Sequence, residues 1–189
     1  MYKKITLSVV AFALIAFSSC KPAASTDDNE APIPAGMVRI NLTKAGIPAT
    51  IDIPDTTKKI NGVEALSSGA IRVYDGNGFN LLINLSGEAI AMKKNDINGD
   101  DLNKPKDWVV NDSNDLVYST QKDTNAFANA KPEYHLYAII KKGANSYYVE
   151  DQSQGADGNV HTFGKDQVQT MLTSAKSITY LKPPVKNPS

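Results

Sequence analysis

Residues 133–150, EYHLYAIIKKGANSYYVE, contain the pattern that decides the fold. Alternating apolar and polar positions predict a β-hairpin here, with its turn at 142–145. In the first strand of this hairpin, side chains such as Leu136 lie on one face, while Tyr137 and Ile139 lie on the other. Because apolar side chains occur on both faces, we expect this strand to lie in the middle of a sheet.

Further short strands are predicted on both sides of this hairpin. The clearest is a second hairpin at 70–85, where Asp75-Gly76-Asn77-Gly78 tolerates positive φ between two apolar runs. The segment 121–131 is polar and indicates a loop. The expected strands are 38–42, 47–53, 70–74, 79–85, 108–110, 116–120, 133–140, 146–150 and 178–181.

Two helices are expected among these strands. Ser86 is predicted to cap a short helix that continues to about Lys94. A longer amphipathic helix is predicted over 165–177. Its apolar stripe consists of Val168, Met171, Leu172 and Ala175. The order of elements favours an α+β fold, with a mainly antiparallel sheet of hairpins and the C-terminal amphipathic helix packed on it.

The first twenty residues have the features of an export signal. Lys3 and Lys4 give a positive start, and the run 5–17 is apolar apart from two hydroxyl residues. Such a run fits the core of a signal peptide, whereas a membrane-spanning helix needs about 20 apolar residues. Small residues then lead directly to Cys20. Because this is the single cysteine of the chain, an intramolecular disulfide is excluded.

The stretch Phe17-Ser18-Ser19-Cys20 resembles the lipobox of bacterial lipoproteins, in the relaxed form found in Bacteroidota. This resemblance implies that a signal peptidase removes residues 1–19. It also implies that Cys20 becomes the first residue, with diacylglycerol on its thiol and a further acyl chain on its amino group. Two or more chains give stable anchoring, so the resemblance implies a protein tethered to a membrane. The alternative is an ordinary signal peptide cleaved elsewhere.

The chain after the leader divides into three predicted parts. Residues 20–36 form the lipidated cysteine and a linker whose prolines, small residues and acids predict a flexible tether. Within it, 25–30 also resembles the acidic stretch that directs Bacteroidota lipoproteins to the cell surface. We expect an outer-membrane location, with periplasmic and surface-facing orientations both open. A single globular domain is expected at 37–182, followed by a disordered tail at 183–189.

Charge and composition exclude several classes of function. The chain has 20 basic and 20 acidic residues, and this balance argues against a nucleic-acid binder. Its hydrophobic fraction of 41% is too high for a wholly disordered protein. The chain has no nucleophile elbow, zinc-protease motif or phosphate-binding loop.

The side chains that could perform catalysis are few. His135 falls in a predicted strand, where a structural histidine is expected, and His161 falls in a loop. These two histidines could also meet in space and bind a metal. Acid–base catalysis needs two carboxylates in contrasting environments. Adjacent acids occur at Asp100–Asp101 and at Glu150–Asp151, and burial of Glu150 would raise its pKa.

A calcium site is the most specific cofactor hypothesis, and no other cofactor is indicated. Asp96, Asn98, Asp100 and Asp107 occupy positions one, three, five and twelve of an EF-hand-like spacing. The pattern departs from an EF-hand at position six, where Asp101 replaces the usual glycine. The alternative is a turn rich in Asn, Asp and Gly.

Four tyrosines suggest a binding surface in the hairpin at 133–150: Tyr134, Tyr137, Tyr147 and Tyr148. On an exposed sheet face they would stack on a glycan or grip a protein partner. The sequence therefore favours a membrane-anchored, non-catalytic binding or interaction module. The alternatives are a carboxylate-dependent hydrolase that uses Glu150 and Asp151, and a structural envelope component. An exposed aromatic platform would favour the first, and a cleft joining a histidine to an ionisable pair would favour the hydrolase.

Overall fold

The structure is a computed structural model of the chain. It describes residues 31–55, 62–75, 78–101, 103, 105–120, 131–155 and 158–182. The chain divides between Ala31 and Pro32, and every element below belongs to the unit that begins at Pro32. The predicted signal peptide, Cys20 and the tail at 183–189 lie outside the described residues.

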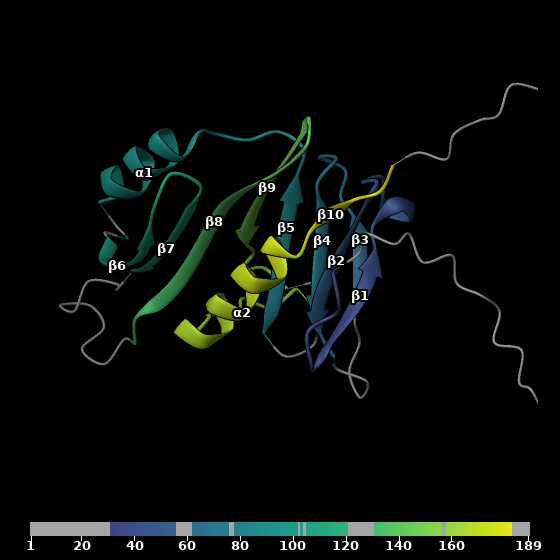
Figure 1. Cartoon of the computed structure of the whole chain (residues 1–189). Coiled ribbons are helices and arrows are strands. Elements are labelled where there is room, and N and C mark those ends of the chain that lie inside the picture. The colour runs from purple at the N-terminus through teal and green to yellow at the C-terminus, as the bar shows by residue number, and fades with distance from the viewer. Residues whose placement is uncertain are drawn as a thin grey trace, which may run out of the picture. The chain divides into compact units, whose positions relative to one another are not determined.

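A seven-stranded antiparallel sheet forms the centre of this unit (Figure 1). The order of its strands is β3-β4-β5-β9-β8-β7-β6. Their bounds are β3 (Gly62–Ala65), β4 (Ile71–Asp75), β5 (Phe79–Asn84), β6 (Pro105–Asn111), β7 (Asp115–Thr120), β8 (Glu133–Lys142) and β9 (Asn145–Asp151). The central location expected for the strand at 133–140 is confirmed, because β8 pairs with β7 on one side and with β9 on the other.

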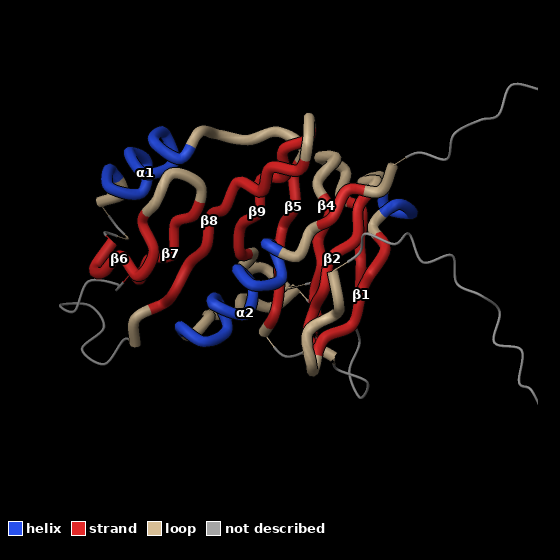
Figure 2. Tube along the Cα trace, in the orientation of Figure 1, coloured by secondary structure: helices blue, strands red, loops and turns tan. Residues whose placement is uncertain are grey.

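A smaller sheet and two helices complete the fold (Figure 2). The three-stranded sheet has the order β1-β2-β10, again antiparallel. The elements are β1 (Met37–Asn41), β2 (Ala49–Pro54), β10 (Thr179–Tyr180), the short 3-10 helix η1 (Thr43–Ala45), α1 (Ile90–Gly99) and α2 (Lys165–Lys176). The predicted α+β class, with antiparallel hairpins and a C-terminal helix against the sheet, is therefore confirmed.

Local sequence explains the two best hairpins. Between β4 and β5, Gly78 has a φ of 83°, and Asp75 accepts a hydrogen bond from the backbone N–H of Phe79 at 3.1 Å. Between β8 and β9, Gly143 has a φ of 62°, and Lys142 pairs with Asn145 across the turn. Glycine adopts these left-handed conformations without the steric cost that a Cβ atom would bring.

One face of the seven-stranded sheet is covered by α2 and by the three-stranded sheet. The stripe predicted for the C-terminal helix is confirmed at Val168, Met171 and Ala175, which are fully buried, while Leu172 is partly buried. They pack with β2 and with the inward side chains of β4, β5, β8 and β9. The buried residues of this cluster include Ile51, Ile53, Ile71, Val73, Leu81, Ile83, Leu136, Ala138, Tyr147 and Val149. This is the main core.

The opposite face of the sheet is covered, over β7, β8 and β9, by α1. Ile97 of α1 packs with Leu116 and Tyr137, which point away from the main core because side chains alternate along a strand. Tyr148 and Ile139 extend this smaller cluster at its border. Figure 1 shows α1 beside β6 and β7, and α2 across β8 and β5.

Several predicted boundaries were wrong. The first helix begins at Ile90 after Ala89, with no cap from Ser86, and it continues to Gly99. Before the helix starts, the chain runs close to the sheet at Gly87, where a Cβ atom would be 2.6 Å from the Tyr148 ring. The strand β3 was not predicted. The predicted loop at 121–131 lies, except for its last residue, outside the described residues.

Candidate functional site

A cavity of about 480 Å³ lies between α1, the ends of β7 and β8, and the segment that follows β9. This volume is within the range of about 300–1,000 Å³ that is typical of small-molecule sites. The lining residues are Lys93, Asp96, Ile97, Asp100, Asn103, Tyr118, Thr120, Glu133, His135, Ser153, Val160, His161 and Thr162. Most of them are polar or ionisable, and both histidines of the chain are among them.

A chain of hydrogen bonds crosses three adjacent strands at this cavity. Thr120 Oγ1 on β7 lies 3.1 Å from His135 Nε2 on β8, and His135 Nδ1 lies 3.1 Å from Asp151 Oδ2 on β9. Asp151 Oδ1 also accepts a hydrogen bond from the backbone N–H of Leu136 at 2.6 Å. An ionised carboxylate only accepts, so Nδ1 carries the proton. In the neutral imidazole, Nε2 must then accept from the Thr120 hydroxyl.

The protonation of His135 is set by opposing effects. Burial by itself would lower its pKa, but the hydrogen bond and charge of Asp151, together with the charge of Glu133, raise the pKa above the ordinary value. The Asp151 side chain is only 7% exposed, whereas that of His135 is 24% exposed. The imidazole is therefore held by a buried carboxylate and still faces the cavity.

Aromatic rings support His135 from one side. The Tyr118 ring lies 5.2 Å from the imidazole, and the Trp108 ring lies 5.5 Å beyond Tyr118, measured between centroids. Burial and the nearby charges of Asp151, Glu150 and Asp100 raise the pKa of the Tyr118 phenol, so it remains a neutral hydrogen-bond donor or acceptor. The Tyr118 ring is tilted by 35° to the imidazole, so it packs against His135 without a parallel stack.

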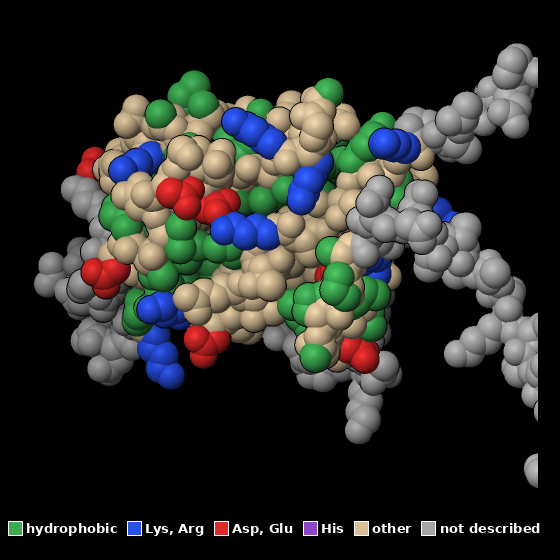
Figure 3. Space-filling model, viewed as in Figure 1, with side chains coloured by type: hydrophobic (Ala, Val, Ile, Leu, Met, Phe, Trp, Pro, Cys, Tyr) green, Lys and Arg blue, Asp and Glu red, His purple; other side chains and the backbone are tan. Residues whose placement is uncertain are grey.

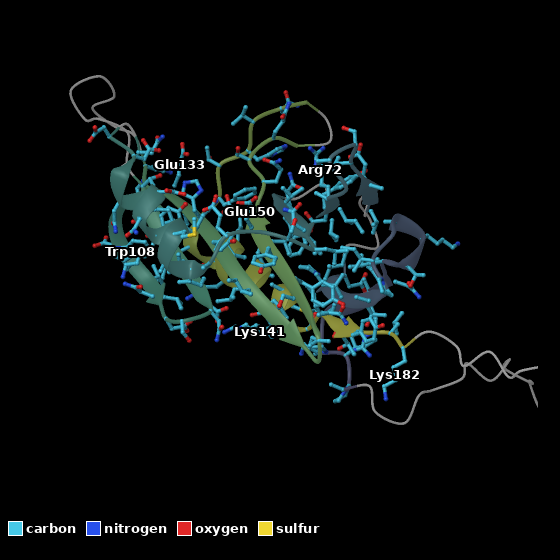
Figure 4. The ribbon with its side chains drawn as sticks, turned by 90° about the horizontal axis from the view of Figure 1, so that it is seen from above. Arg72, Trp108, Glu133, Lys141, Glu150 and Lys182 are labelled. Carbon is cyan, nitrogen blue, oxygen red and sulfur yellow. The ribbon has the colours of Figure 1, made fainter. Side chains whose placement is uncertain are left out.

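An ion pair lies next to the cavity on the α1 side. Lys93 Nζ is 3.1 Å from Glu150 Oε2 and 4.9 Å from the centroid of the Tyr137 ring. Burial and neighbouring charges, partly offset by a hydrogen bond to the Glu88 carbonyl, raise the pKa of Tyr137 to about 12. Figure 4 shows Glu133 and Glu150 on the neighbouring strands β8 and β9. Glu150 therefore meets the charge of Lys93, and the lining of the cavity also includes the carboxylates of Asp96, Asp100 and Glu133.

The segment after β9 is held in place by hydrogen bonds to its backbone groups. Asn80 Nδ2 donates to the carbonyl oxygens of Gln152 and Gln154 at 2.7 and 3.0 Å. The backbone N–H of His161 donates to the Ser153 carbonyl at 2.7 Å, which closes a short loop. These bonds place His161 at the cavity although it is 26 residues from His135 in sequence.

The four predicted tyrosines do not form one exposed face, which corrects the platform geometry expected from the sequence. Tyr147 is 1% exposed in the main core, and Tyr134 packs at the edge of the same core. Tyr137 and Tyr148 point to the opposite face, where Tyr137 is 4% exposed and donates to the Glu88 carbonyl. Strand alternation places the four rings on two faces, and packing buries those of Tyr137 and Tyr147, while Tyr134 and Tyr148 are half-buried.

The residues expected to form a calcium-binding loop lie instead in the helix α1, at its C-terminal end and in the strand β6. Asp96 and Asn98 lie in the last turns of α1, and Asp107 lies in β6. Asp100 accepts hydrogen bonds from the Asn103 backbone and side chain at 3.0 and 3.1 Å. Among the described residues there is no group of three or more His, Cys, Asp or Glu side chains that could hold a metal ion.

The paired acids separate into different roles. Asp151 contacts His135, and Glu150 pairs with Lys93, so the two neighbours face different partners. Thr120 was not predicted as a site residue. Its only sequence signal is its place at the end of a predicted strand, which antiparallel pairing brings beside the start of β8. Nothing in the local sequence indicates the hydroxyl–imidazole contact.

No family model, curated protein or solved structure matches this chain. Within the described residues, no helix is long and apolar enough to cross a membrane. The candidate site is therefore defined by its own geometry.

Proposed function

We propose that this chain is a lipid-anchored envelope protein whose globular unit binds a small, polar, positively charged molecule in the cavity beside α1. The observation that carries the proposal is the cavity itself, because one concave site of about 480 Å³ collects polar side chains from α1, β7, β8 and the segment after β9. Pockets of this size with convergent polar groups are the usual form of small-molecule sites.

The lining favours a cation that also carries hydroxyl groups. Three carboxylates, those of Asp96, Asp100 and Glu133, line the cavity, while the charge of Lys93 is met by Glu150. Thr120 and Ser153 add hydroxyl groups that can donate or accept hydrogen bonds. An amino sugar has both features, and it is consistent with the glycan or small ligand expected for an envelope protein.

Binding is tested with glucosamine, and with glucose as the matched neutral sugar. We expect saturable shifts of backbone amide signals around the cavity in the mature chain, with at least tenfold tighter binding of glucosamine. Asp96→Asn and Glu133→Gln should weaken binding, because each removes a lining charge. Glu64→Gln should not, because Glu64 pairs with Arg72 on the exposed edge formed by β3. Equal binding of both sugars, or none, would contradict the proposed ligand class.

Anchoring rests on the lipobox-like stretch before Cys20 and on the short apolar leader. We place the mature protein in the outer membrane, with no nucleic-acid partner. Acidic and basic side chains are interspersed on the face seen in Figure 3, and the chain has equal numbers of both. This mixture supports the absence of a nucleic-acid partner from the proposal. Mass spectrometry of envelope material should show an acylated Cys20 at the N-terminus, and Cys20→Ser should abolish that modification. An intact leader or an unmodified cysteine in the wild type would contradict this part of the proposal.

A further inference from the structure

The contact between Thr120 and His135 has chemical consequences beyond binding. The side chain of Asp151 fixes the proton on Nδ1, so the free lone pair of Nε2 points at the Thr120 hydroxyl 3.1 Å away. A hydroxyl whose proton is directed at an oriented imidazole base is the arrangement by which alcohol side chains become nucleophiles. Here the three groups come from three consecutive, adjacent strands.

We propose that this chain hydrolyses a small carboxylic ester in the cavity, with Thr120 as the nucleophile, His135 as the general base and Asp151 as a positioning residue. The inference rests on the proposed function in that the same cavity must admit the substrate. The polar, acidic lining favours an ester whose alcohol part is hydroxylated or cationic and whose acyl group is small.

The reaction takes place in two balanced halves. Thr120 Oγ1 attacks the ester carbonyl while its proton passes to His135 Nε2, and the tetrahedral intermediate then expels the alcohol, which leaves with that proton. A water molecule attacks the resulting Thr120 ester and gives a proton to Nε2. The bond to Oγ1 breaks, the hydroxyl regains its proton, and a carboxylic acid is released. No oxidant or reductant is required.

The surroundings of the three residues suit this role. Thr120 is 6% exposed and lines the cavity, so its hydroxyl has little competing bulk water. The Asp151 carboxylate and the Thr120 hydroxyl contact the two ring nitrogens of His135, and the tilted Tyr118 ring packs against the imidazole. Tyr118 also lines the cavity, and its hydroxyl is a donor able to stabilise negative charge on the tetrahedral intermediate.

The test uses the mature chain in detergent with 4-nitrophenyl acetate as the probe. We expect Thr120→Val to lower kcat/KM by about 10²-fold or more, because it removes the nucleophile. Thr120→Ser should retain turnover, because it keeps the hydroxyl. Thr50→Val is the matched control. Thr50 is also a buried strand threonine, 5% exposed, and its hydroxyl has no hydrogen-bond partner among the described residues.

Asp151→Asn tests the positioning role through the pH profile. In the wild type, kcat/KM should rise with pH as His135 loses its proton, and the inflection should lie above the ordinary histidine pKa of about 6.5. An asparagine amide would donate to Nδ1 and place the proton on Nε2, so the rate should fall and this inflection should disappear. A purely structural Asp151 would lower the rate without removing the inflection.

Acid quenching followed by peptide mass spectrometry locates the acyl group. An acetyl group on Thr120 supports the proposal even if Thr120→Val fails to fold. An unmodified Thr120 peptide, or a Thr120→Val variant as active as Thr50→Val, would overturn it. Sugar binding without turnover would refute only the hydrolysis, whereas turnover at Thr120 without glucosamine binding would refute only the ligand class.

Discussion

The two faces of the seven-stranded sheet are filled in different ways. The face under α2 and the three-stranded sheet holds a continuous apolar cluster from β2, β4, β5, β8, β9 and α2. The face under α1 holds a small cluster around Ile97, Leu116 and Tyr137, and next to it the cavity with both histidines. The strands β7, β8 and β9 contribute to both faces, because their side chains alternate.

This difference separates stability from chemistry within one sheet. Apolar burial on the α2 side contributes most of the hydrophobic stabilisation, at roughly 25 cal/mol per Å² of apolar area. Polar and ionisable groups gather on the α1 side, where part of the surface faces solvent and charges are less costly to keep. We therefore expect substitutions on the two faces to have different readouts, stability on one and binding or turnover on the other.

The largest effect on stability is expected from Met171→Ala. Met171 is fully buried on α2, in the middle of the main core. Removing its side chain should lower the free energy of unfolding by about 4 kcal/mol, since the surrounding strands cannot collapse into the space. Urea denaturation followed by circular dichroism measures this loss. A cost below about 1 kcal/mol would show that the α2 side is not where stability is concentrated.

A second substitution tests a charged pair in the three-stranded sheet that covers the main core. Arg39 on β1 donates to both carboxylate oxygens of Asp52 on β2, at 2.7 and 2.9 Å, and the Asp52 side chain is 3% exposed. Arg39→Met should cost about 3 kcal/mol, because it leaves a buried carboxylate without its cation.

The double variant Arg39→Met with Asp52→Leu is the matched control for this pair. It removes both charges, so it should recover much of the lost stability. If the double variant were as unstable as Arg39→Met, lost packing and not the isolated charge would be the cause.

The sequence predicted the α2 side better than the α1 side, and the reason is physical. Apolar periodicity records which face of a strand or helix is buried, so the hairpin at 133–150 and the stripe through Met171 could be located. Gly78 and Gly143 marked turns through their own backbone preferences. None of these signals depends on contacts between distant residues.

The candidate site could not be found in the same way. His135, Asp151 and Thr120 meet through strand pairing, and the length and conformation of the intervening loops are not encoded in a local pattern. The start of α1 was also misplaced, and the close approach of Gly87 to the Tyr148 ring of β9 before this helix has no signal in the local sequence. The predicted calcium spacing failed for a related reason, since Asp96 and Asn98 continue the helix instead of forming a loop.

The third prediction compares Ile97→Ala with Met171→Ala. Ile97 is 7% exposed and borders the cavity, so its removal enlarges a space that already exists. We expect a cost of about 2 kcal/mol, near the lower end for such substitutions. The same denaturation measurement checks this value. A cost equal to that of Met171→Ala would show that the α1 side contributes to stability as strongly as the main core.

The smallest effect is a pH dependence that belongs to the α1 side. Because the folded pKa of His135 is raised, the histidine contributes stability that is fully present below its unfolded pKa of about 6.5 and is lost as pH rises through the folded value. The charged groups at this site are Asp151, Glu133, Asp96, Asp100 and Lys93, and the His161 ring also lines the cavity. The stability advantage of the wild type over His135→Gln should therefore shrink as the pH rises from below about 6.5 through the raised pKa of the folded state.

Urea midpoints of both proteins across this range measure the change, and His161→Gln is the matched control. His161→Gln changes the other histidine of the cavity and keeps the contact between His135 and Asp151. It should therefore leave the pH dependence of the wild type largely intact. If His135→Gln kept a constant difference from the wild type at all pH values, the ion pair with Asp151 would not form in solution. The orientation of the imidazole toward Thr120 would then lose its physical basis, and the two faces of the sheet would differ only in packing.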